Sequence, residues 1–181
     1  MSMTDTQLAT YLAGFSNVVT GDVKREAFVV YLRKDSTDDW HPLGYKQESA
    51  AISNNYEEEN IKDVLGNVYN DITSKAEEID MSEYKIHSTH SPFLDDIWKA
   101  TLAGLENTLN SYQLLMVCSW LQNSSDAMLA RMVENVSVNL DNMGGQGYTT
   151  ADLKISGISR GVFGTVSSLT SPAFVEGTVS Q

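Results

Sequence analysis

The segment from Glu48 to Ile86 constrains the fold most, because it is long, acidic and poor in aliphatic side chains although it lies in the middle of the chain. It carries ten acidic residues and three basic ones, a net charge of −7 out of the −12 of the whole chain. Burial of apolar surface is the main favourable term in folding, and this segment offers little of it. The segment therefore has little apolar surface with which to build a core of its own.

Two interpretations compete for this segment. Apolar residues recur at spacings near three and four over about Ile61–Asp80, which predicts an amphipathic helix. Alternatively, Gly66-Asn67 breaks the run and separates two long strands, Ile52–Asp63 and Val68–Ile86, in a hairpin. Composition alone slightly favours the helix.

The length of 181 residues is sufficient for one domain, spanning residues 1–181, with a sizeable core. A hydrophobic fraction of 41% and a charged fraction of 20% are typical of a folded protein. The net charge of −12 argues against a free nucleic-acid-binding protein, since such proteins neutralise phosphates with clustered Lys and Arg. The sequence contains no such cluster.

The single cysteine, Cys118, cannot form an intrachain disulfide and lies in the apolar run Leu114–Leu121. We expect it to be a small buried side chain rather than a catalytic thiol. No run approaches the ~20 apolar residues that cross a membrane, and the N-terminus lacks the basic region of a secretory signal. We therefore expect no membrane segment, and folding in a cytoplasm.

Strand-like runs flank the acidic segment. Ala27–Arg33 is rich in β-branched and aromatic residues and predicts a hairpin with Trp40–Tyr45. The chain is again β-rich after residue 111, with strands predicted at Tyr112–Leu121, Ala127–Leu140, Leu153–Ile158 and Gly161–Val166. Residues 1–22 and 167–181 are predicted to be terminal arms, the first of which becomes ordered only by packing on something else.

One helix is predicted over residues 91–106. Ser91 suits the N-cap, and Pro92 suits the first helical position. The apolar residues on one broad face are Phe93, Leu94, Ile97, Trp98, Thr101, Leu102 and Leu105. We expect this face to be buried against a sheet. The order of the elements predicts a mainly β (α+β) fold, a β-sandwich or partial barrel with one packed α-helix.

The residue types of catalytic and metal sites do not form a group in the sequence. His87 and His90 are three residues apart, but this spacing brings two ligands together only on a helix, and the pair precedes the predicted cap. Adjacent carboxylates such as Asp95-Asp96 have like surroundings, whereas acid–base catalysis needs unlike ones. The Gly-rich stretch Asn142–Gly147 lacks the lysine of a phosphate loop. We predict no catalytic residue, no metal and no cofactor, and a structural or binding protein rather than an enzyme.

A succession of features runs along most of the chain. A strand at Val29–Leu32 and a return at Trp40–Gly44 precede the acidic stretch around Asp63–Gly66. They are followed by the strand Tyr69–Lys75, the segment Ser82–Lys85, His90-Ser-Pro92, the helix and a β-rich half. This succession resembles the major tail (tail tube) proteins of long-tailed bacteriophages.

The resemblance implies a sandwich-like subunit, six copies of which form a ring, with stacked rings enclosing a channel for DNA and a tape-measure protein. It also implies that residues 48–86 form a long hairpin that reaches the neighbouring ring, that the arms contact other subunits, and that tail terminator and tip proteins are partners. The inter-ring contact residues implied are Asn55, Tyr56, Glu57, Glu58, Glu59, Asn60, Ile61, Asp63, Val64, Leu65, Gly66 and Asn67.

Physical arguments favour the same interpretation, so we adopt the hairpin. An open set of strands needs a neighbour to pair its edges, and a closed ring removes those edges. An acidic channel would repel the phosphate backbone and let DNA slide. The expected location is a virion tail assembled in the host cytoplasm. The alternatives are a head–tail joining or capsid decoration protein, a small binding module and, more distantly, a hydrolase using His87 or His90.

Overall fold

The computed structural model describes residues 3–43, 51–62, 68–85, 92–147 and 149–178. Helices in these residues are α1 (Asp5–Leu12), α2 (Pro92–Ala103) and α3 (Glu106–Leu109), with a short 3-10 turn at Arg25–Ala27. The strands are β1 (Ser16–Asn17), β2 (Phe28–Arg33), β3 (His41–Pro42), β4 (Ala51–Lys62), β5 (Val68–Lys85), β6 (Tyr112–Gln122), β7 (Met128–Gly144), β8 (Thr150–Ile158), β9 (Val162–Val166) and β10 (Val175–Glu176).

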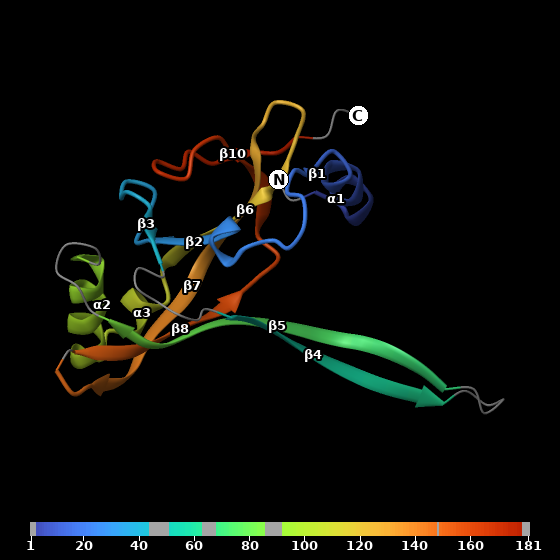
Figure 1. Cartoon of the computed structure of the whole chain (residues 1–181). Helices are drawn as coiled ribbons and strands as arrows, with labels where there is room; N and C mark the ends of the chain where they lie inside the picture. The colour runs from blue at the N-terminus through green and yellow to red at the C-terminus, as the bar shows by residue number, and fades with distance from the viewer. Residues whose placement is uncertain (1–2, 44–50, 63–67, 86–91, 148, 179–181) are drawn as a thin grey trace.

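The strands form one antiparallel sheet in the order β3-β2-β6-β7-β8-β5-β4, with β1 added to β6, β9 to β7 and β10 to β9 (Figure 1). This architecture confirms the predicted mainly β fold. The prediction of a single helix is wrong, because α1 and the short α3 accompany α2 among the described residues.

Strand β7 joins the two halves of the sheet. Its first part pairs with β6 and β9, and its second part pairs with β8. Between them Tyr112 pairs with Val136 and Leu114 with Val133, so β7 contains an extra residue opposite β6. Asn135 takes a left-handed φ of 58° at this bulge. The bulge changes which face of the sheet the even-numbered residues of β7 occupy.

The first hydrophobic core lies on one face of the sheet, under α2 and α3. Its members come from strands at both ends of the sheet order, so the sheet curls around them. They include Leu32 of β2, Leu114 of β6, Val138 of β7, Ile155 of β8 and Tyr84 of β5. This curled sheet corresponds to the partial barrel expected from the sequence.

The second core lies on the other face of β2, β6 and β7. Leu115 of β6 and Ala130 of β7 are buried there, and Leu169 and Phe174 of the C-terminal segment pack against the cluster. The Tyr31 hydroxyl donates to the carbonyl of Leu169 at 2.7 Å. The described part of the predicted C-terminal arm therefore lies on its own sheet.

The predicted N-terminal arm contains helix α1. A capping box, in which Thr4 and Gln7 bond each other's backbone amides, begins the helix. A Cβ added to Gly177 would lie 2.4 Å from Tyr11 Cζ, which shows how closely the helix approaches the C-terminal segment. The described part of the predicted N-terminal arm thus contains a capped helix that contacts the C-terminal segment.

Helix α2 ends earlier than predicted. It runs from Pro92 to Ala103, because Gly104 takes a left-handed φ of 65°, and a separate turn of helix, α3, follows at Glu106. The predicted cap at Ser91 lies outside the described residues. Ile97 is buried as expected, whereas Leu102 and Leu105 are 69% and 52% exposed, so this part of the predicted apolar face is wrong.

The carboxylate of Asp152 bridges irregularities in both strands that flank β8. Asp152 Oδ1 accepts from the Glu83 amide of β5, and Oδ2 accepts from Asn142 Nδ2 of β7, both at 2.8 Å. Glu83 and Asn142 have left-handed φ values of 54° and 50°, at points where the register of their strands shifts. The bond from Asn142, and then that from Glu83, lowers the pKa of Asp152.

We predict that Asp152→Ala destabilises the unassembled protein by about 0.5–1 kcal/mol at neutral pH, at the low end for charged hydrogen bonds because solvent screens this site. A lowered pKa in the folded state means that the carboxylate stabilises the fold above its unfolded pKa, and that this contribution disappears as the pH falls through the folded value. Urea unfolding from pH 7 down to about 3 should show a smaller loss of stability on acidification in the variant than in the wild type. The exposed Asp22→Asn serves as control, and a variant with the wild-type pH dependence would contradict this role.

Candidate assembly interface

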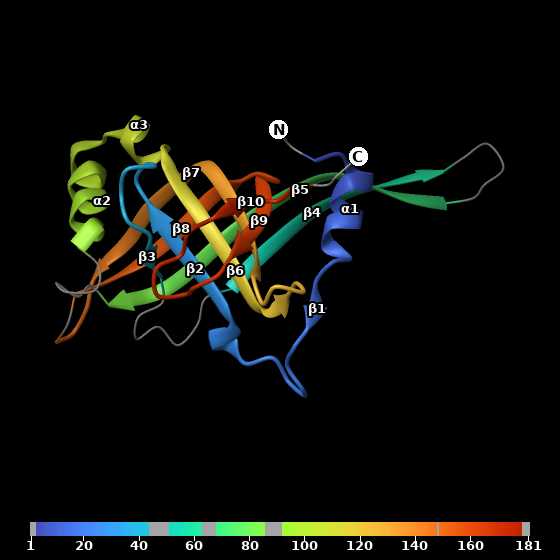
Figure 2. The ribbon, with the colours of Figure 1, turned by 90° about the horizontal axis from the view of Figure 1, so that it is seen from above.

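Strands β4 and β5 form a long antiparallel ribbon. Their register runs from Ala51 opposite Asp80 to Lys62 opposite Val68, with one irregularity beside Glu57. The ribbon extends away from the rest of the subunit in two perpendicular views (Figures 1 and 2). The hairpin interpretation is therefore confirmed, and the helix suggested by periodicity over Ile61–Asp80 is wrong.

Contacts at the base of β5 explain why the strand conformation prevails. Ile79, Met81 and Tyr84 are all at most 1% exposed and belong to the first core. The same part of β5 pairs with β8. Hydrogen bonding and burial supplied by β8 thus override the local helical periodicity, as tertiary context commonly does.

The outer part of the ribbon has few described neighbours. Pairing of β5 with β8 begins at Glu77, so residues 68–76 of β5 have β4 as the paired strand that the structure describes. Strand β4 ends the sheet order. A two-stranded ribbon is only marginally stable by itself, and an open strand edge is a template for pairing with another chain.

The predicted contact residues fall into two groups. Residues 55–61 lie on β4 and are paired with residues 69–76 of β5. The remaining ones, Asp63, Val64, Leu65, Gly66 and Asn67, lie outside the described residues. The register also sets Glu59 opposite Asp71.

Two ion pairs lie where the ribbon leaves the sheet. Arg131 Nη2 of β7 is 2.7 Å from Glu77 Oε2, and the two side chains are only 18% and 5% exposed. The neighbouring Glu78 lies 2.9 Å from Lys154 Nζ of β8, but this pair is much more exposed. The base of the ribbon therefore has a buried ion pair with β7 and a more exposed ion pair with β8, which solvent screens.

Helix α1 lies beside this base. A hollow of about 370 Å³ is lined by Leu8 of α1, Glu77, Arg131 and the residues that connect β8 to β9. Asp5 of α1 forms an ion pair with Arg160 in that connection. The N-terminal arm thus borders the same hollow as the buried pair.

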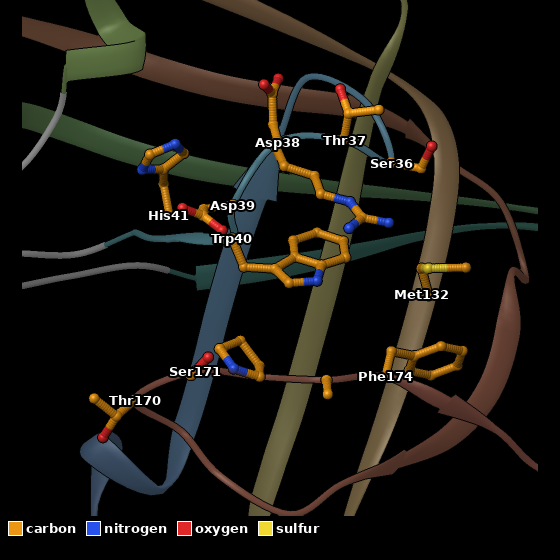
Figure 3. A pocket seen from close by; sticks show the side chains of 13 residues that line it. Ser36, Thr37, Asp38, Asp39, Trp40, His41, Met132, Thr170, Ser171 and Phe174 are labelled. Atoms are coloured by element: carbon orange, nitrogen blue, oxygen red, sulfur yellow. The ribbon is translucent and has the colours of Figure 1, made fainter.

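A larger open groove of about 760 Å³ separates the turn before β3 from the C-terminal segment (Figure 3). The Arg33 guanidinium lies 4.1 Å from the ring centroid of Trp40, and Arg33 Nε donates to Gln113 Oε1. The opposite wall is formed by residues 170–174, with Phe174 near Met132. The sequence analysis did not identify this groove, because its two walls, residues 36–41 and 170–174, are far apart in the chain.

The described residues do not assemble a metal-binding group of three or more His, Cys, Asp or Glu. His87 and His90 lie outside them. Cys118 is half-buried rather than fully buried as predicted, and its partial burial raises the pKa of the thiol to about 11, so the thiol is protonated at neutral pH. Within the described parts of the chain, the helices are too short and polar to span a bilayer.

No protein-family model and no curated protein sequence matches the chain. Solved structures do. The PVC sheath-tube complex of an extracellular contractile injection system in its extended state contains a chain that is 12% identical, with a TM-score of 0.51, over 91% of this chain and 100% of the other. The anti-feeding prophage cap, a tube-terminating cap, is 14% identical, with a TM-score of 0.52, over 83% of this chain and 95% of the other. The chain therefore has the fold of tube and cap proteins of phage-tail-like injection systems, a broader group than the long-tailed phage proteins that its sequence resembles.

Proposed function

We propose that the chain is a structural subunit that polymerises as stacked hexameric rings into the tube of a phage tail or a related injection particle. The observation that carries this proposal is the long β4–β5 ribbon, which extends beyond its own sheet on a fold shared with tube proteins. Assembly takes place in the host cytoplasm, and the product belongs to the virion tail. A tape-measure protein and terminator or tip proteins are the further partners that the family resemblance suggests.

Ring closure follows from the two ends of the sheet order. The order ends at the two-residue β3 on one side and at the twelve-residue β4 on the other. The unpaired backbone groups of such edge strands find hydrogen-bond partners when identical subunits associate into a closed ring. The ribbon then supplies the contact between successive rings.

The surface we propose for the channel is the face of β5, β8 and β7 that turns away from the first core. Asp80 and Asp141 are exposed there, and Asp80 is paired in register with Lys154 and Asp141 with Asp152. Lys154 is occupied by its ion pair with Glu78. A predominantly negative surface repels phosphates, which suits a channel through which DNA slides.

A tube-terminating cap is the second candidate, because one of the similar structures is such a cap. A cap would share the ring-forming fold but would stop growth rather than extend it. A joining or decoration protein and a binding module remain alternatives, distinguished by copy number, since a tube protein is among the most abundant components of its particle.

We predict that the purified chain, when concentrated, forms six-fold rings and tubes visible by negative-stain electron microscopy. In such an assembly the open strand edges and the ribbon would pair with or contact identical neighbouring subunits. Rings that do not lengthen would favour the cap. A strictly monomeric protein under all salt and crowding conditions would contradict both candidates.

The ribbon can be shortened without disturbing its base. Joining Asn55 to Ala76, which are paired in register, through an added Asn-Gly turn removes the outer ribbon and keeps Glu77. We expect this variant to unfold at nearly the wild-type urea concentration, because the deleted residues pair with each other, but to form no stacked tubes. Tube growth at the wild-type rate would show that the outer ribbon makes no inter-ring contact.

The channel assignment predicts a change in DNA retention. Tubes of Asp80→Lys with Asp141→Lys, assembled in the presence of short duplex DNA, should retain nuclease-resistant DNA that is lost steeply as salt rises. Wild-type tubes should retain none. Asp38→Lys with Asp39→Lys makes the same charge change in the groove of Figure 3 and is the control. Equal protection in both variants, or none in either, would contradict the assignment.

A further inference from the structure

Glu77 is the one charged residue that is buried among the residues whose side chains the structure describes. It lies on β5 at the last position that pairs with β8, opposite Ile158, and its other register neighbour is Asn54 of β4. Beyond it the ribbon leaves the sheet. The buried carboxylate is therefore located at the transition between the body of the subunit and its projecting element.

Arg131 connects this carboxylate to a different part of the fold. Its guanidinium contacts Glu77 at 2.7 Å, while Nε donates to the Arg160 carbonyl at 2.9 Å and Nη2 donates to the Ser159 carbonyl. The carbonyls belong to the connection between β8 and β9, and Arg131 itself is paired with Phe163 of β9. One side chain thus joins β5, β7 and the β8–β9 connection with directional bonds.

The backbone pairing between β5 and β8 is irregular at this point. Glu77 pairs with Ile158 but Ile79 pairs with Ile155, so β8 contains an extra residue, and Gly157 takes a left-handed φ of 72°. A bulge bends the strand and interrupts the ladder. The charged hydrogen bonds that the Arg131 guanidinium donates have a fixed fork geometry, and they can constrain the direction of β5 at this irregular point.

The energetics of a buried ion pair favour a role for Glu77 and Arg131 in fixing the geometry of the ribbon rather than in stabilising the fold. A buried ion pair loses about as much by desolvation as it gains by attraction, and its replacement by apolar residues of similar volume is often neutral or stabilising. The side chains of Glu77 and Arg131 are only 5% and 18% exposed, so much of this cost applies to the pair. Burial of such a pair at this one place needs a reason other than folding free energy.

We propose that Arg131, through Glu77, is the positioning residue of the assembly ribbon and fixes the direction in which β4 and β5 leave the subunit. The inference rests on the proposed function, because a ribbon that reaches the next ring must arrive with one orientation. A ribbon that swings freely would lose conformational entropy each time a contact orders it, and this cost would weaken the contact.

The test replaces the pair by apolar residues, Glu77→Leu with Arg131→Met, so that no buried charge is left alone. Spin labels at Asn60→Cys on the ribbon and Asn139→Cys on β7, in a Cys118→Ala background, report the direction of the ribbon in unassembled protein. We expect one narrow distance distribution in the parent protein and a broad one in the variant. Without the labels, the protein concentration needed for tube growth should rise about tenfold or more.

The matched control is Glu78→Leu with Lys154→Met, which removes the same charges from the adjacent, exposed pair. It should leave the distances and the assembly concentration unchanged. A narrow distribution in the Glu77→Leu, Arg131→Met variant, or equal broadening in the control, would overturn the proposal. If the double variant does not fold, Glu77→Gln keeps the volume and removes the charge, and wild-type distances in that variant would likewise overturn it. Should the parent protein form no tubes, the proposed function fails, while the distances still decide the role of Arg131.

Discussion

The pairing of β7 with three other strands is the constraint on which the rest of the fold depends. Its first part holds β6 and β9, its second part holds β8, and the bulge at Asn135 separates the two. Because of this bulge Ala130 faces the second core while Val136 and Val138 face the first. One strand thereby organises both cores, and through β8 it carries β5 and the ribbon.

The ribbon is an element whose stability is concentrated at one end. Ile79, Met81 and Tyr84 hold its base in the first core, and Arg131 and Glu77 add directional bonds beside them. Farther out, β4 and β5 pair with each other. Two strands alone are only marginally stable in water, so such a ribbon gains stability from a second surface. In the assembly that we propose, contact between subunits would provide that surface.

The acidic composition would have two consequences in the assembly that we propose. Repulsion between unassembled subunits would oppose premature pairing of their open strand edges. After assembly the same charges on the face of β5, β8 and β7 would make the proposed channel repulsive to phosphate. The groove between the turn at Asp38 and the segment near Phe174 is a further concave surface. It lies beside the second core and forms because the C-terminal segment lies on its own sheet.

The sequence by itself determined the mainly β class, the strands β2 and β6 to β9, and the distinct acidic segment at residues 48–86 that we propose for assembly. These follow from local signals, namely β-branched runs, turn residues and charge. Periodicity and turn residues left a helix and a strand open for residues 68–85, and the family resemblance favoured the strand. Only the tertiary structure shows why the strand prevails, since burial of Tyr84 and pairing with β8 outweigh the helical periodicity. The buried pair of Glu77 and Arg131, 54 residues apart, and the groove beside Trp40 also depend on pairings of distant strands. No local pattern encodes such contacts, because their residues become neighbours only when the sheet order is established.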